Sequence, residues 1–354
     1  MKALVLAGGT GSRLRPFSHS MPKQLMPIAN KPVLVHVMED LRSLGVREAG
    51  VVVGDRGGEI AAALGDGAAL GLRLTYIRQD VPRGLADCIA VSRDFLGADD
   101  FVMYLGDNVL TEGVKDIADE FRAHRPAAQL VVHPVPDPRD FGVAETDATG
   151  RVLRLVEKPR HPRSDRAVIG VYFFTPAIHE AVAAIEPSAR GELEVTDAIQ
   201  WLVARGHDVR ARLYRGFWKD TGKVEDVLHC NRRLLDRLKP SVVGEVDGTS
   251  ELLGAVVVEE GARIVRSRIT GPAVIGAGST VEDSHIGPYT AIGRDCVLGA
   301  AGVEDSIILD GARVHRVSGV HGSVVGRDAT VSAEAHTGGS RLVVGDHSSV
   351  VVAA

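Results

Sequence analysis

Residues 2–16, KALVLAGGTGSRLRP, join an apolar run to a glycine-rich loop and two arginines. The run from Ala3 to Ala7 has the apolar or small residues of a buried strand. The glycines after it let a ligand approach the main chain closely, and main-chain N–H groups beside Arg13 and Arg15 favour an anion, most plausibly a phosphate. The alternative is an ordinary glycine-rich turn with solvated arginines, since short glycine motifs recur by chance.

Two familiar phosphate-binding motifs do not fit this loop. A P-loop requires Gly-Lys followed by Ser or Thr, which does not occur here. A dinucleotide fingerprint requires a third glycine, and Leu14 stands at that position. The loop therefore binds phosphate in another way or not at all.

Strand-like and helix-like segments alternate along the chain after this loop. The expected strands are 2–7, 49–54, 72–77, 101–106 and 128–135, and the expected helices between them are 32–45, 58–65, 85–97 and 114–125. This alternation predicts an α/β fold with a Rossmann-like, mostly parallel sheet and helices on both faces. Sites in such folds lie beyond the carboxyl ends of the strands, where the glycine loop and Asp107 stand.

The later part of this region has a different order of elements. Two strand-like runs within 143–159 predict a hairpin, and a strand, two helices, another strand and an amphipathic helix over 223–238 follow. Lys239-Pro240 ends that helix. The sequence therefore predicts one domain over 1–239 and a second domain over 240–354.

Valine, isoleucine and leucine recur six residues apart beyond Pro240. The intervals are Val258–Ile264, Ile275–Val281, Ile286–Ile292–Leu298, Ile308–Val314–Val320, Val325–Val331 and Val344–Val350. This hexapeptide repeat predicts a left-handed parallel β-helix with one inward apolar residue on each side of a three-sided coil. Slips at Val281–Ile286 and near residue 300 predict irregular coils. A sandwich of short strands is the weaker alternative.

Composition and charge exclude several classes of protein. The chain has 354 residues and a formal net charge of −5, which gives no support to binding of nucleic acid or of an anionic membrane. Cys88, Cys230 and Cys296 are too widely spaced for a metal cluster or a disulfide framework, and fit a reducing compartment. The first apolar run is too short for a signal peptide or a membrane span. We therefore expect a cytoplasmic protein.

Several charged residues suit a phosphorylated substrate, although each has a simpler explanation. Lys23 would add a second cation near the loop, and the simpler explanation is a surface lysine. Asp107 and Asp220 each close a strand-like run and could hold Mg²⁺ or merely cap turns. Glu157 and Lys158 would suit a sugar phosphate, or form an exposed strand end. Glu194 opens a helix and could simply favour its dipole.

The hexapeptide domain also raises the possibility of an acyltransferase, which would need a catalytic histidine in a coil loop. The available histidines are His285, His315, His321, His336 and His347. Nothing in the sequence singles one of them out, which makes this the less favoured function.

Six motifs, in this order and spacing, resemble those of the sugar-1-phosphate nucleotidylyltransferases. They are LAGGTGSRLRP, PKQLMPIANKP, GLAD, LGDN, EKP and KDTG, and the resemblance covers residues 1 to about 235. PKQLMPI is similar to the branch that transfers a thymidylyl group to glucose 1-phosphate. The resemblance implies that dTTP and glucose 1-phosphate give dTDP-glucose and pyrophosphate, which supplies deoxysugar biosynthesis.

The resemblance also implies roles for individual residues. Leu6, Gly8, Gly9 and Gly11 would wrap the nucleotide, with Arg13 and Lys23 on its phosphates. Gln79 and Gly84 would read the base edge, and Asp107 and Asp220 would bind Mg²⁺. The sugar-phosphate pocket would contain Gly142, Glu157, Lys158, Val168 and Glu194. The β-helix is expected to join copies of the chain into a homo-oligomer.

Two departures from the pattern of the short thymidylyl enzymes affect fine selectivity. Phe141 stands where they usually have tyrosine, and Asp87 where they usually have glutamine. A uridylyltransferase, or an enzyme that accepts both nucleotides, is the runner-up among enzymes. A non-catalytic regulatory subunit is the alternative from another class, although Arg13, Lys23 and both aspartates are present.

Overall fold

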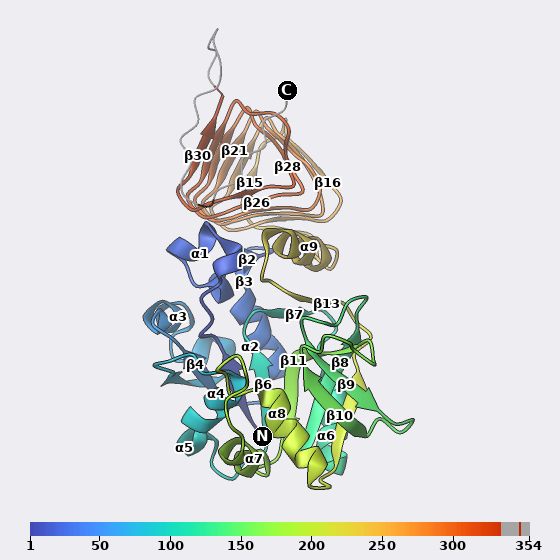
Figure 1. Ribbon diagram of the computed structural model, residues 1–354. Coiled ribbons are helices and arrows are strands. Elements are labelled where there is room, and N and C mark those ends of the chain that lie inside the picture. The colour runs from blue at the N-terminus through green and yellow to red at the C-terminus, as the bar shows by residue number, and fades with distance from the viewer. Residues whose placement is uncertain (334–346, 348–354) are drawn as a thin grey trace. The chain divides into compact units, whose positions relative to one another are not determined.

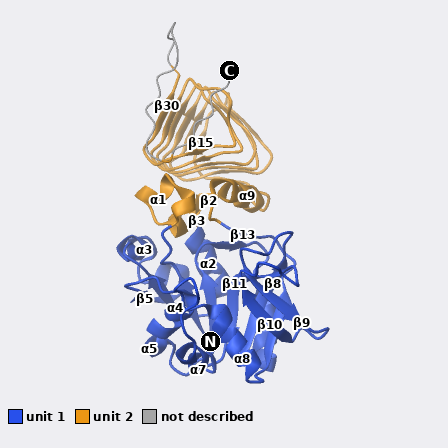
Figure 2. Cartoon of the chain, in the orientation of Figure 1, with its two compact units in different colours: residues 1–10, 33–220 blue, residues 11–32, 221–354 orange. Residues whose placement is uncertain are grey.

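The computed structural model describes residues 1–333 and residue 347. Contacts between residues divide the chain into two compact units: unit 1 is residues 1–10 and 33–220, and unit 2 is residues 11–32 and 221 onward (Figure 2). The functional boundary at residue 239 stays a prediction. No helix within the described residues is long and apolar enough to cross a membrane.

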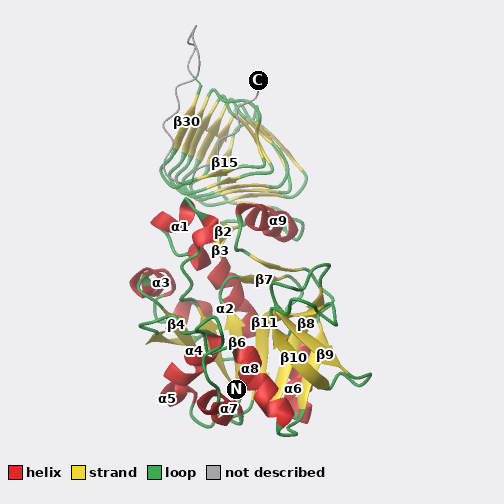
Figure 3. Cartoon of the chain, in the orientation of Figure 1, coloured by secondary structure: helices red, strands yellow, loops and turns green. Residues whose placement is uncertain are grey.

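Unit 1 is an α/β fold built on a nine-stranded sheet with flanking helices, as predicted (Figures 1 and 3). Its strands are β1 Lys2–Leu6, β4 Glu48–Val53, β5 Arg73–Arg78, β6 Phe101–Leu105, β7 Asn108–Leu110, β8 Ala128–Pro134, β9 Gly142–Thr146, β10 Val152–Glu157, β11 Arg166–Phe174, β12 Val209–Leu213 and β13 Trp218–Asp220. Strands β7 and β13 form a separate two-stranded sheet. Its helices are α2 Val33–Ser43, α3 Gly57–Leu64, α4 Leu85–Val91, α5 Arg93–Leu96, α6 Lys115–His124, α7 Ile178–Ala184 and α8 Val195–Ala204.

The first four long strands are parallel and lie in the order β5-β4-β1-β6. Leu6 at the end of β1 pairs with Val52 of β4 and with Leu105 of β6, so these strands end at the same level. Their loops therefore emerge at one edge of the sheet. After β1 the chain forms β4 and β5 on one side of it and then β6 on the other. The strand order therefore reverses beside β1, and ligands bind at such a switch point in sheets of this kind.

The rest of the sheet is mixed. Strand β11 runs antiparallel to β6, β8 and β9, and β9 and β10 form the predicted hairpin. The helix predicted over 85–97 is instead two helices, α4 and α5, which meet at Ser92. Ser92 has φ −94° and ψ 6°, outside the helical region, and periodicity alone does not detect such a local break.

Unit 2 contains a three-sided parallel β-helix, in agreement with the predicted left-handed form (Figure 1). One side is β14 Ser241–Val242, β17 Val256–Val258, β20 Ala273–Ile275, β23 Thr290–Ile292, β26 Ile307–Ile308 and β29 Val324–Val325. The second is β15 Glu245–Val246, β18 Arg263–Val265, β21 Thr280–Glu282, β24 Val297–Gly299, β27 Arg313–His315 and β30 Thr330–Ser332. The third is β16 Glu251–Leu253, β19 Arg268–Thr270, β22 His285–Ile286, β25 Gly302–Glu304 and β28 Val320–His321.

The repeat residues Ile264, Ile275, Val281, Ile286 and Ile292 line the buried interior of the β-helix. The six-residue recurrence therefore marks the residues that form the core of the β-helix, as the sequence predicts. The last predicted repeat, Val344–Val350, lies outside the described residues.

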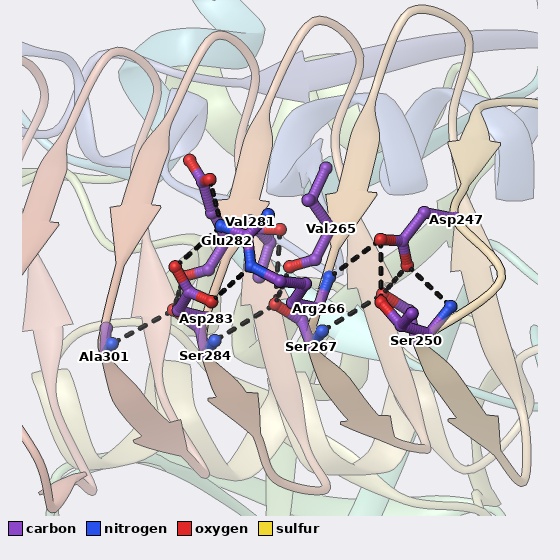
Figure 4. A network of polar contacts seen from close by, with 11 residues as sticks. Asp247, Ser250, Val265, Arg266, Ser267, Val281, Glu282, Asp283, Ser284 and Ala301 are labelled. Carbon is purple, nitrogen blue, oxygen red and sulfur yellow. Dashed lines mark hydrogen bonds and ion pairs between the residues drawn. The ribbon is translucent and has the colours of Figure 1, made fainter.

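A ladder of serines explains why the six-residue step slips. The backbone N–H of Ser267 donates to Ser250 Oγ, that of Ser284 to Ser267 Oγ and that of Ala301 to Ser284 Oγ, each at 3.0 Å and each across 17 residues (Figure 4). A central coil is thus one residue shorter than three full hexapeptides. The residues preceding Ser267, Ser284 and Ala301 all have positive φ, between 44° and 50°, which turns the shortened corner tightly.

Unit 2 also contains the segment 11–32 and helix α9 Val224–Leu235. Asn231 of α9 accepts from the N–H of Ala29 at 2.9 Å and donates to Tyr289 O at 3.0 Å. Arg232 of α9 forms a two-pronged ion pair with Asp305, and Asn30 donates to Ile292 O at 2.5 Å. The middle coils of the β-helix therefore support the segment that carries Arg13 and Lys23.

Candidate active site

The ends of β1, β4 and β5 bring the glycine loop against Gln79. A Cβ atom on Gly8 would lie 3.5 Å from Gly54 N and 3.8 Å from Gln79 Oε1. The N–H of Gln79 donates to Val53 O at 2.9 Å and continues the ladder beyond β5. Leu6 is buried at the end of β1, and Gly9 is exposed in the loop. The side-chain amide of Gln79 thus lies at the strand edge where Gly8 leaves the main chain open.

Gly84 is held in a position that only glycine can occupy. Its φ is +107°, and an added Cβ would lie 2.4 Å from Leu193 O. On either side of it, the N–H of Leu193 donates to Arg83 O at 2.6 Å and that of Ala86 donates to Leu193 O at 3.0 Å. These two bonds, here called the Leu193 clamp, join the loop after β5 to the residue before Glu194.

A short antiparallel pair brings the segments of Asp107 and Asp220 together. Strand β13 pairs with β7, and Asp220 lies opposite Asn108, the residue after Asp107. Asn108 is buried, and its side chain donates to Ile169 O at 2.6 Å, which fixes the start of β7. Two aspartates from paired segments supply the oxygen ligands that Mg²⁺ takes, since this ion binds one or two carboxylates together with substrate phosphates.

Three residues predicted for the sugar pocket, Gly142, Glu157 and Val168, converge in unit 1. Glu157 pairs with Gly142 between β10 and β9. A Cβ on Gly142 would lie 2.7 Å from Thr196 Cγ2, 3.4 Å from Glu157 Oε2 and 3.9 Å from Val168 Cγ2. The hydroxyl of Thr196 donates to Glu157 Oε2 at 3.1 Å. Gly142 therefore leaves space beside a carboxylate that is already held in place.

The same cluster contains a second carboxylate and two cations. Lys158 Nζ lies 3.8 Å from Glu157 Oε1, and Arg190 Nη1 lies 3.5 Å from the same oxygen. Arg190 Nε is also 3.5 Å from Glu194 Oε1, to which the Ser188 hydroxyl donates at 3.0 Å. This arrangement suits a sugar phosphate, because the two carboxylates can accept hydrogen bonds from sugar hydroxyls and the cations can pair with the phosphate.

Burial of the Glu157 carboxylate raises its pKa, and the nearby Glu194 carboxylate raises it further. Lys158, the Thr196 hydrogen bond and Arg190 lower it by less. Ionisation of Glu157 is therefore less favourable here than in water. Such shifts are common where function requires an ionised group.

In unit 2 the residues predicted to contact phosphates lie in two short 3₁₀ turns. Gly11 caps the turn Ser12–Leu14 with φ +65°, and its Cβ position would lie 3.0 Å from Lys23 Cβ. Lys23 opens the turn Lys23–Leu25, between Pro22 and Met26. The turn is a single one, because it is enclosed by extended-type backbone at Pro22 and Met26.

The sequence interpretation missed three polar partners in the sugar cluster. Ser188, Arg190 and Thr196 come from the segment 187–197, in which the sequence indicates only Glu194. No spacing rule signals them, because their contacts depend on how this segment, which runs into the first turn of α8, packs beside β10. Within the described residues, no group of three or more His, Cys, Asp or Glu side chains is arranged to hold a metal ion.

A model of the nucleotidyl transferase family matches residues 2–237. The chain belongs to this family. Nucleotidyl transferases generally use a divalent metal ion, and the pair Asp107 and Asp220 has the oxygen ligands that such an ion requires.

Two curated relatives match this nucleotidyl transferase over nearly its whole length. A protein of Streptomyces griseus named glucose-1-phosphate thymidylyltransferase is 55% identical over 349 residues, or 98% of each chain. One of Streptomyces antibioticus with the same name is 51% identical and covers 99% of each chain. The likeness thus includes the β-helix.

A solved structure supports the fold of the first two thirds of the chain. It is from Bacillus anthracis, is named as a glucose-1-phosphate thymidylyltransferase and is in complex with sucrose. It has a TM-score of 0.61 and 33% sequence identity, and covers 65% of this chain and 94% of its own.

The raised pKa of Glu157 has a measurable consequence for stability. A carboxyl whose folded-state pKa lies above its unfolded value favours folding below the unfolded pKa, and this contribution is lost as pH rises through the folded pKa. Glu157→Gln removes the titration. We expect the difference in Tm, variant minus wild type, to be more favourable to the variant at pH 8 than at pH 4.

Glu186→Gln is the matched control for this prediction, because Glu186 is an exposed carboxylate near the same segment. Its Tm difference from wild type should change little between the two pH values. If the Tm difference between Glu157→Gln and wild type is the same at pH 4 and pH 8, folding does not raise the pKa of this carboxyl.

Proposed function

We propose that this protein joins dTTP to glucose 1-phosphate, giving dTDP-glucose and pyrophosphate. Two full-length relatives, 55% and 51% identical, have the name of this activity. The motif PKQLMPI and the residues Gln79 and Gly84 support the thymidylyl branch independently.

The observation that carries the proposal is the Leu193 clamp. It joins Gly84, proposed to read the base, to the segment that continues into Glu194, proposed to hold the sugar. The distance between nucleotide and sugar phosphate is thereby set by backbone hydrogen bonds. Fixed placement of two reactants is the main means of catalysis available to such an enzyme.

Each remaining residue has a role that its chemistry allows. Leu6, Gly8, Gly9 and Gly11 line the path of the triphosphate, and Arg13 and Lys23 neutralise its phosphates. Glu157 and Glu194 accept hydrogen bonds from sugar hydroxyls, with Gly142 and Val168 shaping the pocket. Lys158 contacts the sugar phosphate, and Arg190 and Thr196 orient the two carboxylates.

Asp107 and Asp220 would hold Mg²⁺, which would offset negative charge on the nucleotide phosphates. Asparagine at either position would supply a neutral amide, which could not replace the negative charge of the carboxylate in this role. The arrangement needs no third protein carboxylate, because phosphate oxygens and waters complete the coordination of Mg²⁺.

The chemistry requires no general base. A phosphate monoester has a second pKa of about 6, so glucose 1-phosphate is already anionic near neutral pH. One of its oxygens attacks the α-phosphorus of dTTP in line, and the bond from that phosphorus to the bridging oxygen of pyrophosphate breaks. Positioning and charge neutralisation then supply the catalysis.

Three further parts of the proposal concern the whole protein. The catalytic function is assigned to residues 1–239, and residues 240–354 are predicted to join copies of the chain into an oligomer. The reaction is placed in the cytoplasm, where the three buried cysteines would remain thiols. Light scattering of the full chain would test the oligomer.

A matrix of pyrophosphate-release rates tests the proposed substrates. dTTP, UTP, CTP, ATP and GTP are each combined with the 1-phosphates of glucose, mannose, galactose and N-acetylglucosamine. We expect the maximum at dTTP with glucose 1-phosphate. A maximum at ATP or GTP would contradict the thymidylyl assignment, and no release in any combination would favour a regulatory subunit.

A further inference from the structure

Gln79 is held by a buried carboxylate. Its Nε2 donates to Asp87 Oδ2 at 2.7 Å, and Gln79 and Asp87 are only 8% and 4% exposed. Asp87 lies in the first turn of α4, four residues after Arg83, whose Nη2 is 3.3 Å from Asp87 Oδ1. The carboxylate is thus itself fixed by a cation at the mouth of the loop.

These contacts permit only one orientation of the Gln79 amide. The two groups that face Nε2 are the Asp87 carboxylate and the carbonyl of Gly84, at 3.4 Å, and both are acceptors. The Cys88 thiol is a further neighbour of the amide: its S–H points to Gly84 O at 3.6 Å, and a hydrogen bond from Gln79 acts to lower its pKa, although burial raises that pKa to about 12. An amide turned by 180° would place its oxygen against the carboxylate.

The oxygen of the amide must therefore point away from Asp87. Gln79 Oε1 faces the glycine loop, 3.8 Å from the Cβ position of Gly8. No donor from the described residues reaches this oxygen. A buried side chain thus presents one unpaired acceptor at the ligand-binding edge of the sheet.

We propose that Asp87 is a specificity-determining residue that fixes Gln79 as an acceptor, so that the site takes only bases with an N–H at the edge Gln79 reads. This inference rests on the proposed function, in which Gln79 contacts the nucleotide base. Thymine and uracil have a donor at N3, whereas cytosine has a lone pair there. Cytosine would place two acceptors against each other in a buried site.

The strength of this selection follows from the chemistry of buried polar groups. A site that is built to pair with an N–H rejects an analogue without it far more strongly than a pocket rejects a change of size. The thymine methyl group does not enter this argument. Asp87 therefore separates thymine and uracil from cytosine, and leaves the choice between thymine and uracil to other residues.

The test compares nucleotides that differ only in the base. dUTP and dCTP share the deoxyribose and triphosphate, and glucose 1-phosphate is the common acceptor. For the wild-type protein we expect kcat/KM for dUTP to exceed that for dCTP by about 100-fold or more. N3-methyl-dTTP, which lacks the N3 proton, should be as poor a substrate as dCTP.

Asp87→Asn keeps the size of the side chain but can donate as well as accept, so the Gln79 amide is free to turn. We expect the dUTP to dCTP ratio to fall by about tenfold or more. The KM for glucose 1-phosphate should remain unchanged. Asp80→Asn is the matched control, because Asp80 is an exposed neighbour paired with Arg78 at 2.7 Å, and it should leave the ratio as in wild type.

The outcomes separate this inference from the proposed function. An Asp87→Asn variant with a lower Tm and an unchanged ratio would show that Asp87 only stabilises α4, and would overturn the inference while dTTP turnover stands. If the variant does not fold, a wild-type protein that uses dCTP or N3-methyl-dTTP as well as dUTP overturns it equally. No turnover by wild type with any nucleotide would overturn the proposed function and the inference together.

Discussion

Asp107→Asn and Asp220→Asn are each expected to lower kcat by about two orders of magnitude or more while the protein remains folded. Asp220 lies opposite Asn108, the residue after Asp107, in the pair of β13 with β7, so the two aspartates come from paired segments. Asparagine keeps the size of the side chain and removes the charge. The apparent affinity for Mg²⁺, measured by titration of the activity, should fall in both variants.

Asp116→Asn is the control for the loss of one negative charge, because Asp116 is exposed in the first turn of α6. It should retain the wild-type kcat and the wild-type requirement for Mg²⁺. If either Asp107→Asn or Asp220→Asn turns over normally at limiting Mg²⁺, that residue only stabilises a turn and the two-carboxylate site is wrong.

Gly84→Ala is expected to lower kcat/KM by about 100-fold or more and to destabilise the protein by about 2 kcal/mol. The new Cβ would lie 2.4 Å from Leu193 O in a backbone conformation with φ +107°, so the Leu193 clamp must open. Because the clamp connects Gly84 to the segment of Glu194, the KM values for both substrates should rise. Steady-state kinetics and urea unfolding would measure the two effects.

Gly58→Ala is the matched glycine control. Gly58 lies in α3 and has no atom within 4 Å of its Cβ position, so alanine should be neutral or stabilise by up to about 1 kcal/mol. A Gly84→Ala variant that loses stability but keeps both KM values would mean that the clamp holds no functional geometry.

The sequence predicts the framework of the fold because each part is encoded locally. Apolar runs such as Ala3–Leu6 form strands, and the six-residue recurrence of Ile275, Val281 and others marks the interior of the β-helix. The 17-residue coil is not predicted, because it depends on corners at residues such as Asp283 that adopt positive φ without being glycine. The break at Ser92 and the support of segment 11–32 by the β-helix depend on tertiary packing in the same way.

The site is predicted in part. Gly142, Glu157 and Val168 lie close together, as expected of a sugar pocket. Asp107 directly precedes β7, the strand that pairs with the strand of Asp220. The polar partners Arg190 and Thr196 could not be predicted, since they come from a loop and from the first turn of α8, both distant in sequence from Glu157. The sequence flags Asp87 only as a departure from the short enzymes, and its bond to Gln79 becomes visible only in three dimensions.

The central claim is that an oxygen of glucose 1-phosphate attacks the α-phosphorus of dTTP, and an isotope measurement tests it most directly. Glucose 1-phosphate is labelled with ¹⁸O in its non-bridging phosphate oxygens, and the products with dTTP are analysed by mass spectrometry. We predict that all of the label appears in dTDP-glucose and none in pyrophosphate, with turnover dependent on Mg²⁺. Label in pyrophosphate, or release of pyrophosphate without a nucleotide sugar, would contradict this account.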